Sequence, residues 1–214
     1  AAVKKVQCSF SDKTLHAASP NGATLHLFAP EQIPEIQQLF DEHIREILVA
    51  YYGCAFRINT VRIWRNLPVS DADPERHDVF SNTFHHDNTR VTGLRVFILL
   101  TDGVTRDTGS FRFHNAKDSR RIVRTFGYFH RFMLTKGMLK RFINQKTLQF
   151  FEGDAGDCTL VNTQECLHAA SIPKQGSYRD MLQFEVYPDM GKAKDTAALF
   201  STMSPDEEIL KLKK

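Results

Sequence analysis

The sequence predicts a mainly β protein, a double-sheet jelly roll with flanking α-helices. Short runs of alternating or β-branched residues recur through most of the chain, and turn-forming Asp-Gly and Thr-Gly pairs separate them. The clearest helical pattern comes before these runs. A chain of 214 residues with 42% hydrophobic composition suits one core. We therefore expect a single domain over residues 1–214.

An amphipathic helix is expected in the N-terminal portion, at about residues 30–52. Pro30 is a favourable first residue, and Gly53 offers a stop. Between them, apolar residues recur at spacings of three and four, as one face of a helix requires: Ile33, Ile36, Phe40, Ile44, Ile47 and Tyr51.

The expected jelly-roll core extends over about residues 56–188. Its predicted strands are residues 56–65, 83–86, 94–101, 110–114, 147–151, 158–161, 167–170 and 179–187. The interrupting segment 119–145 is expected to be partly helical. A helical tail is expected over about residues 204–214, because Ser204, Pro205 and the following acids form a helix start.

Composition excludes several classes of protein. No run approaches the roughly 18 apolar residues of a membrane helix, and the first ten residues lack the apolar stretch of a signal peptide. A net charge of +3 is too small to indicate a nucleic-acid partner. The four cysteines form no CxxC pair, so we expect reduced thiols and a cytoplasmic protein.

A basic segment at residues 117–141 carries eight cationic residues interleaved with aromatic residues. It could bind an anionic substrate, a carrier-bound phosphate group or nucleic acid, and if it is functional we expect it to shape the mouth of the pocket. A solvated basic face over buried aromatic residues is the simpler interpretation, and we favour it.

The sequence His85-His86-Asp87 predicts part of a metal site. Residues two apart on a strand share a face, so His85 and Asp87 can bind one metal while His86 turns away. His168 follows a later strand and is the expected third ligand. Two imidazoles and one carboxylate are the ligands of non-haem iron(II) oxygenases.

An arginine is expected beside this metal. Arg179 begins the strand after His168, and we expect the two strands to form an antiparallel pair that places these residues nearly opposite each other. A guanidinium binds a carboxylate through two hydrogen bonds. A co-substrate that chelates iron and presents a carboxylate at its far end would fit, and 2-oxoglutarate has that shape.

These residues resemble the phytanoyl-CoA dioxygenase family of iron/2-oxoglutarate oxygenases. The likeness covers roughly residues 56 to 188. It rests on an aromatic-His-x-Asp motif, a strand ending in Leu-Thr-Asp, a Gly turn, a Gly-Asp pair, and a Leu-His followed by arginine eleven positions later. Their counterparts here are Phe84 to Asp87, residues 97–102, Thr108-Gly109, Gly156-Asp157, Leu167-His168 and Arg179.

The resemblance implies a double-stranded β-helix, the cupin-like form of the jelly roll, with Fe(II), 2-oxoglutarate and O2 as cofactor and co-substrates. This chain departs from the family where Ala170 replaces a Ser or Thr that often helps to hold the co-substrate. For the second polar contact to 2-oxoglutarate we choose Thr83, with Trp64 and Arg65 as rivals.

The expected function is hydroxylation of a C–H bond in a small, possibly anionic, metabolite, with release of succinate and CO2. Desaturation, cyclisation and epoxidation use the same ligands, so the sequence does not separate them from hydroxylation. Two alternatives remain: a cupin-type metal enzyme that does not use 2-oxoglutarate, and a non-catalytic jelly-roll binding protein. Intact His85, Asp87, His168 and Arg179 favour the first function.

Overall fold

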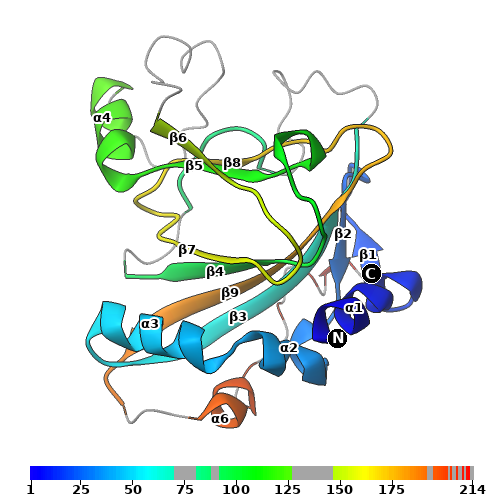
Figure 1. The fold of residues 1–214 in the computed structure, drawn as a ribbon, viewed down its shortest axis with the longest axis horizontal. Helices are drawn as coiled ribbons and strands as arrows, with labels where there is room; N and C mark the ends of the chain where they lie inside the picture. Colours follow the sequence, from blue (N-terminus) through cyan, green and yellow to red (C-terminus); the bar gives the residue numbers. More distant parts are fainter. Residues whose placement is uncertain are drawn as a thin grey trace.

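Two antiparallel β-sheets face each other in the computed structural model, which describes residues 1–69, 81–87, 92–126, 147–191, 195–201, 203, 206, 209, 211 and 212. The larger sheet has the order β1-β2-β3-β9-β4-β7 and the smaller sheet the order β6-β5-β8 (Figure 1). Their bounds are β1 His16–Ala18, β2 Thr24–Leu27, β3 Ala55–Asn66, β4 Leu94–Leu99, β5 Phe111–His114, β6 Leu148–Phe151, β7 Cys158–Val161, β8 His168–Ala170 and β9 Arg179–Asp189. This is the predicted jelly roll.

Helices cover the face of the larger sheet that points away from the smaller sheet (Figure 1). On that face lie α2 (Pro34–Leu39), α3 (Glu42–Tyr52) and α6 (Thr196–Ser201), and α1 (Ala2–Cys8) lies beside α2. The ring of Phe40 packs on Phe184 of β9, with ring centroids 4.9 Å apart. The helix-covered face of the larger sheet therefore forms the main hydrophobic core, and its other face lines the space between the two sheets.

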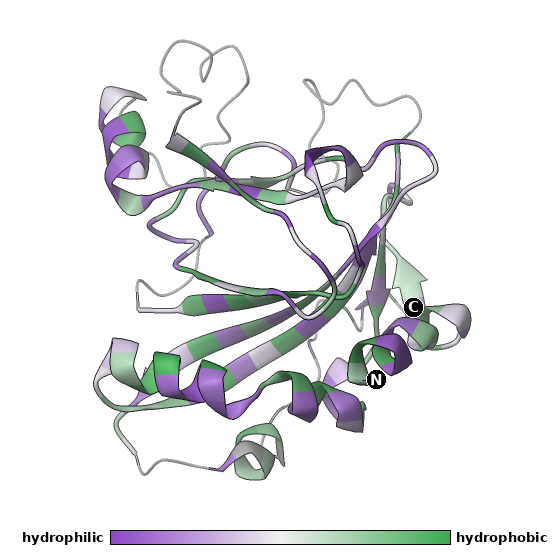
Figure 2. Cartoon of the chain, viewed as in Figure 1, coloured by the Kyte–Doolittle hydropathy of each residue, from purple (hydrophilic) through white to green (hydrophobic). Residues whose placement is uncertain are grey.

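Successive side chains along each strand alternate between the hydrophobic core and the space between the sheets. Along β3 and β9, hydrophobic and hydrophilic residues alternate (Figure 2). On β9 the even positions Leu182, Phe184 and Val186 belong to the helix-covered core, whereas Arg179, Met181 and Gln183 line the space between the sheets. The burial of β9 on both faces explains why its polar side chains are almost inaccessible to solvent.

The predicted N-terminal helix is divided. A 3-10 turn, Pro30–Gln32, precedes α2, and a new helix α3 begins after Asp41, whose carboxylate accepts a hydrogen bond from the Ile44 amide at 2.9 Å. Gly53 ends α3 in the left-handed conformation, as expected. Because the break shifts the helical phase, Leu48 is buried while the predicted stripe residues Ile47 and Tyr51 are exposed.

Most of the predicted strands are present, within two residues of their expected ends. The segment 83–86 is an exception, since it contributes only a single bridge between His85 and His168. The hairpin of β1 and β2 was not predicted, because its strands have three and four residues and show no clear alternation. The predicted start of a C-terminal helix at Ser204 and Pro205 lies outside the described residues.

The expected pairing of the strands that carry His168 and Arg179 is wrong. Strand β8 pairs with β5 in the smaller sheet, whereas β9 pairs with β3 and β4 in the larger sheet. Both edges of β9 are therefore already hydrogen-bonded, and the connection over residues 171–178 crosses from one sheet to the other. His168 and Arg179 lie across the interior from each other.

None of the helices in the described residues combines the length and apolarity needed to cross a bilayer. Helix α4 (Ala116–Phe126) carries the first part of the basic segment, and Lys117, Arg120, Arg121 and Arg124 are all exposed on it. This part agrees with a solvated basic face. Residues 127–141 of the segment lie outside the described residues.

Candidate metal centre and the adjoining cavity

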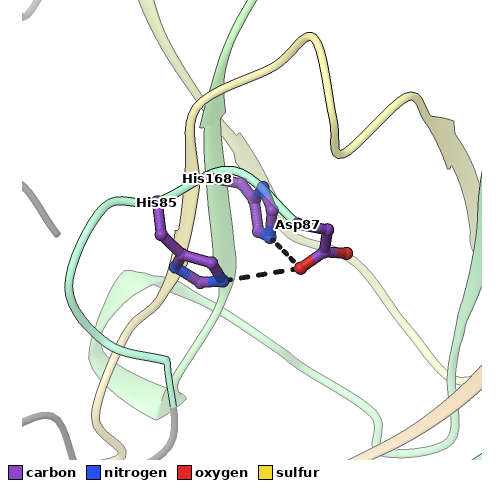
Figure 3. Close-up of side chains that lie close together, drawn as sticks. All are labelled: His85, Asp87 and His168. Carbon is purple, nitrogen blue, oxygen red and sulfur yellow. Dashed lines mark ion pairs between the residues drawn. The ribbon is translucent and has the colours of Figure 1, made fainter. Parts of the chain in front are cut away.

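Three predicted ligands converge at the inner face of the smaller sheet. The side chains of His85, Asp87 and His168 point toward one another (Figure 3), and their ligand atoms all lie within 4.8 Å of one another. Asp87 Oδ1 is 3.7 Å from His85 Nε2 and 3.5 Å from His168 Nε2. The backbones of His85 and His168 form two mutual hydrogen bonds of 3.0 Å, which fix one ligand beside the other.

Backbone carbonyls orient both imidazoles. His85 Nδ1 lies 2.8 Å from the carbonyl oxygen of Thr83, and His168 Nδ1 lies 3.0 Å from that of Cys166. A carbonyl oxygen only accepts, so each Nδ1 carries the proton and donates it. In the neutral tautomer with this proton, each Nε2 presents a lone pair toward the point that it shares with Asp87 Oδ1, as metal coordination requires.

Asp87 is held in place from behind. Its Oδ2 accepts a hydrogen bond of 2.7 Å from Thr163 Oγ1, and Arg95 Nε lies 3.4 Å from the same oxygen. Burial opposes ionisation, but the neighbouring His168 and His85 and the charge of Arg95 outweigh it and hold the pKa of Asp87 well below its usual value. The carboxylate is therefore ionised, and Oδ1 is available as a single ligand atom.

His86 takes no part in this cluster, as expected. Its Nδ1 lies 2.5 Å from the carbonyl oxygen of Gln164. His114 is also outside it: the ring is fully buried on β5 against Phe84, with centroids 5.4 Å apart. His130 lies outside the described residues.

A cavity of about 320 Å³ extends from the three ligands into the space between the sheets, and Arg179 lines it. The Arg179 side chain is 2% exposed; Nη1 donates to the Gly109 carbonyl and Nη2 to Asn66 Oδ1. Among the residues that the structure describes, its Nε has no partner. Burial lowers the pKa of Arg179 to about 10, so the guanidinium keeps its charge at neutral pH.

No carboxylate among the described residues forms an ion pair with Arg179. Its neighbour Asp180 points to the opposite face of β9, where it binds Arg65 through hydrogen bonds of 2.7 and 2.8 Å. A buried cation without an acidic partner is costly for a fold. The cavity is therefore prepared to receive an anionic group at this end.

The three candidates for a second polar contact occupy different places. Thr83 supplies its carbonyl to His85 and is not among the cavity-lining residues. Arg65 is engaged by Asp180 on the outer face. Trp64 lines the cavity, and its indole N–H donates to Asn66 Oδ1 at 3.0 Å.

Sequence reasoning missed several polar residues of this cavity or its support, among them Asn66, Arg95, Thr163 and Gln183. A signal existed for Asn66, Arg95 and Gln183. Polar residues recur at alternate positions within the otherwise apolar strands β3, β4 and β9, which marks a polar face inside the protein. On residues 57–65 this polar face includes Arg62 and Trp64, which line the cavity. Thr163 lies in a polar turn that carries no such pattern.

Solved structures share this fold. HygX from Streptomyces hygroscopicus, determined with nickel and 2-oxoglutarate bound, is 15% identical over 87% of this chain and 78% of its own, with a TM-score of 0.57. The epimerase SnoN from nogalamycin biosynthesis, in complex with Fe3+, alpha ketoglutarate and nogalamycin RO, is 13% identical over 92% and 77%, with a TM-score of 0.59. The carbocyclase SnoK from the same biosynthesis is 14% identical over 92% and 80%, with a TM-score of 0.55.

These likenesses establish the fold, which this chain shares with non-haem iron enzymes that depend on 2-oxoglutarate. No protein-family model matches the sequence, and no curated protein matches it at a significant level.

Proposed function

We propose that this protein is an Fe(II)/2-oxoglutarate-dependent oxygenase that hydroxylates a C–H bond of a small molecule. One observation carries the proposal: a buried arginine without an acidic partner lines the same cavity as a His-Asp-His cluster. The cluster suits a divalent transition metal, and the arginine suits the far carboxylate of a chelating dianion. Structural neighbours that hold a metal together with 2-oxoglutarate support this pairing.

The donor set fits the metal. Two neutral imidazole nitrogens and one ionised carboxylate oxygen face a common point, and the cavity leaves the opposite side open. When bound, iron supplies the oxidative decarboxylation of 2-oxoglutarate by O2, in which one oxygen atom enters succinate and the other enters the product. His85, Asp87 and His168 hold the metal, and Arg179 orients the co-substrate.

The second contact to 2-oxoglutarate stays a proposal. Thr83 was our expectation from the sequence. Trp64 lies in the cavity wall, but its single indole donor is already bonded to the Asn66 that also binds Arg179, so Trp64 is not the better choice. We also propose that this chain belongs to the phytanoyl-CoA dioxygenase family. The basis is the set of motif residues between Phe84 and Arg179 given above.

The first test is spectroscopic. Addition of Fe(II) and 2-oxoglutarate without oxygen should produce the visible charge-transfer band of the chelate. Arg179→Met keeps most of the side-chain volume but removes the charge. It should weaken the binding of 2-oxoglutarate roughly 100-fold, because a charge-assisted hydrogen bond is lost. Arg57→Met, at an exposed position of β3, is the matched control and should leave the affinity unchanged.

The alternatives predict other results. A cupin-type enzyme that does not use 2-oxoglutarate would bind iron without the band, and a non-catalytic binding protein would bind no iron through these residues. His168→Ala should abolish tight iron binding, and unchanged affinity in that variant would remove the third ligand. Succinate release across a panel of metabolites, compared with Asp87→Ala, measures catalysis directly.

A further inference from the structure

A second group of polar side chains lies on the larger sheet within the same cavity. His26, Arg62 and Gln183, which we call the polar floor, come from the adjacent strands β2, β3 and β9 (Figure 1). Arg62 pairs in register with Gln183, and His26 pairs with Trp64, two residues beyond Arg62 on β3. All three line the cavity, so they share its inner face.

Two members of the polar floor lack hydrogen-bond partners. Gln183 is 9% exposed, and within the described parts of the chain its amide has no partner. His26 Nδ1 is buried and also has none. Buried polar groups are almost always hydrogen-bonded in folded proteins, so unpaired ones on residues that line a cavity indicate groups reserved for a ligand.

The polar floor carries no unbalanced charge. Arg62 Nε forms an ion pair of 2.5 Å with Asp206, whose side chain is 6% exposed. Burial, assisted by the charge of Arg62, lowers the pKa of His26 to about 4, so its imidazole is neutral at physiological pH. Arg95, farther along the same face, is balanced by Asp87 and Glu185.

Arg179 is therefore the cavity-lining cation, within the described residues, that has no acidic partner, and the proposed function uses it for 2-oxoglutarate. A second anion in the cavity would find no cation to balance it. A hydroxyl or carbonyl group, in contrast, matches an amide that donates and accepts and an imidazole nitrogen.

We infer that the polar floor binds an uncharged hydroxyl or carbonyl group of the substrate, so that the substrate is a neutral, oxygenated small molecule where it enters the cavity. The inference rests on the proposed function, because it requires that 2-oxoglutarate occupies Arg179. It replaces the expectation of an anionic metabolite with a neutral one.

Trp64 provides a direct readout, since it is the single tryptophan of the sequence and lines the cavity. The protein is first saturated with Fe(II) and 2-oxoglutarate without oxygen. Cyclohexanol, methylcyclohexane and cyclohexanecarboxylate are then titrated separately, and Trp64 fluorescence reports binding. These probes share a ring and differ in offering a hydroxyl, an apolar methyl or a carboxylate.

Gln183→Met keeps the length of the side chain but removes its hydrogen-bonding amide. We expect Gln183→Met to weaken the binding of cyclohexanol roughly three- to tenfold, which is the effect of losing one neutral hydrogen bond, while methylcyclohexane binds as well or better. His26→Leu should change the affinities for these two probes in the same directions. Gln149→Met, at an exposed position of β6, is the control and should change neither affinity.

The outcomes distinguish a failure of the proposed function from a failure of the role assigned to the polar floor. A charge-transfer band in the wild type and in Gln183→Met shows that the metal and co-substrate site is intact in both. If the band is present but Gln183→Met and His26→Leu leave cyclohexanol affinity unchanged, or if cyclohexanecarboxylate binds most tightly, the polar floor does not have this role. Absence of the band in the wild type would overturn the proposed function and this inference with it.

Discussion

At the scale of single residues, the site depends on groups that hold the ligands as much as on the ligands. Asp87 would be free to rotate if only its metal-facing oxygen were engaged. Thr163 prevents this by bonding Asp87 twice, through its hydroxyl to Oδ2 at 2.7 Å and through its carbonyl oxygen to the Asp87 amide at 3.1 Å. Residues that orient a metal ligand in this way commonly influence affinity almost as strongly as the ligands themselves.

Thr163→Val tests this arrangement, because valine has nearly the same shape and lacks the hydroxyl. We expect Fe(II) affinity to fall roughly 10- to 100-fold, since Oδ2 loses its closest donor. The measurement is a titration with Fe(II) under anaerobic conditions. Thr125→Val removes an exposed hydroxyl on α4 and should leave the affinity unchanged. Equal metal affinity in the two variants would show that Arg95 alone suffices to orient Asp87.

The ligands could be predicted from the sequence because metal coordination requires particular residue types at short, regular spacings. His85 and Asp87 are two residues apart, and His168 and Arg179 stand at the boundaries of recognisable strands. Thr163 could not be identified in this way, and for Asn66 and Gln183 the alternation of polar residues marks an inward face without showing what each residue binds. Their roles depend on which side chains meet across the interior, and a polar residue in a turn or strand looks the same with or without such a contact.

At the scale of elements, the turn before β5 determines where Arg179 points. Gly109 precedes β5, and its carbonyl accepts a hydrogen bond from Arg179 Nη1. The residue has φ +100, and an added Cβ would lie 2.8 Å from Pro173 Cγ and 3.2 Å from the Ser171 carbonyl oxygen. The segment 171–178 that joins β8 to β9 is therefore packed directly against this glycine.

Gly109→Ala should consequently displace both the connection and the carbonyl that holds Arg179. We expect weaker 2-oxoglutarate binding, measured by titration of the charge-transfer band, together with a loss of about 1–3 kcal/mol in unfolding free energy from the strained backbone. Gly156→Ala is a close control, because Gly156 has φ +105 but nothing within 4 Å of the added Cβ. It should lose similar stability and keep its affinity. A parallel loss of affinity in both variants would contradict a specific role for Gly109.

Elements with strong local signals were predictable, and their pairings were not. The boundaries of β7 were predicted to the residue because turn residues flank a short apolar run. The pairing of β8 with β9 was expected because the two strands are adjacent in the sequence, yet each joins a different sheet. Adjacency favours pairing only where both strands have a free edge, and neither edge of β9 is free.

At the scale of the whole molecule, the two sheets enclose polar groups that the unfolded chain would expose to water. His26 lies half-buried on the larger sheet and His114 lies buried on the smaller sheet. Among the described residues, His26 Nδ1 and both ring nitrogens of His114 are buried without a hydrogen-bond partner. Burial lowers the pKa of both imidazoles, that of His26 to about 4. Arg62 lowers and Asp206 raises the pKa of His26, while Asp118 raises and Arg112 lowers that of His114. The fold therefore accepts both rings in their neutral form.

This arrangement predicts a loss of stability in mild acid. Below about pH 6.5 the unfolded chain protonates these histidines, while the folded state resists protonation until its lowered pKa is reached. The unfolded state then binds more protons, so the free energy of unfolding falls as the pH falls from about 6.5 to about 4. His26 contributes no more than about 3 kcal/mol to this loss. Urea unfolding of the metal-free protein at pH 7 and pH 4.5 measures this loss.

The double variant His26→Leu with His114→Leu should flatten the pH dependence of the unfolding free energy. His43→Leu, at an exposed position of α3, should not. A double variant that loses as much stability as the wild type would assign the acid sensitivity to the carboxylates instead.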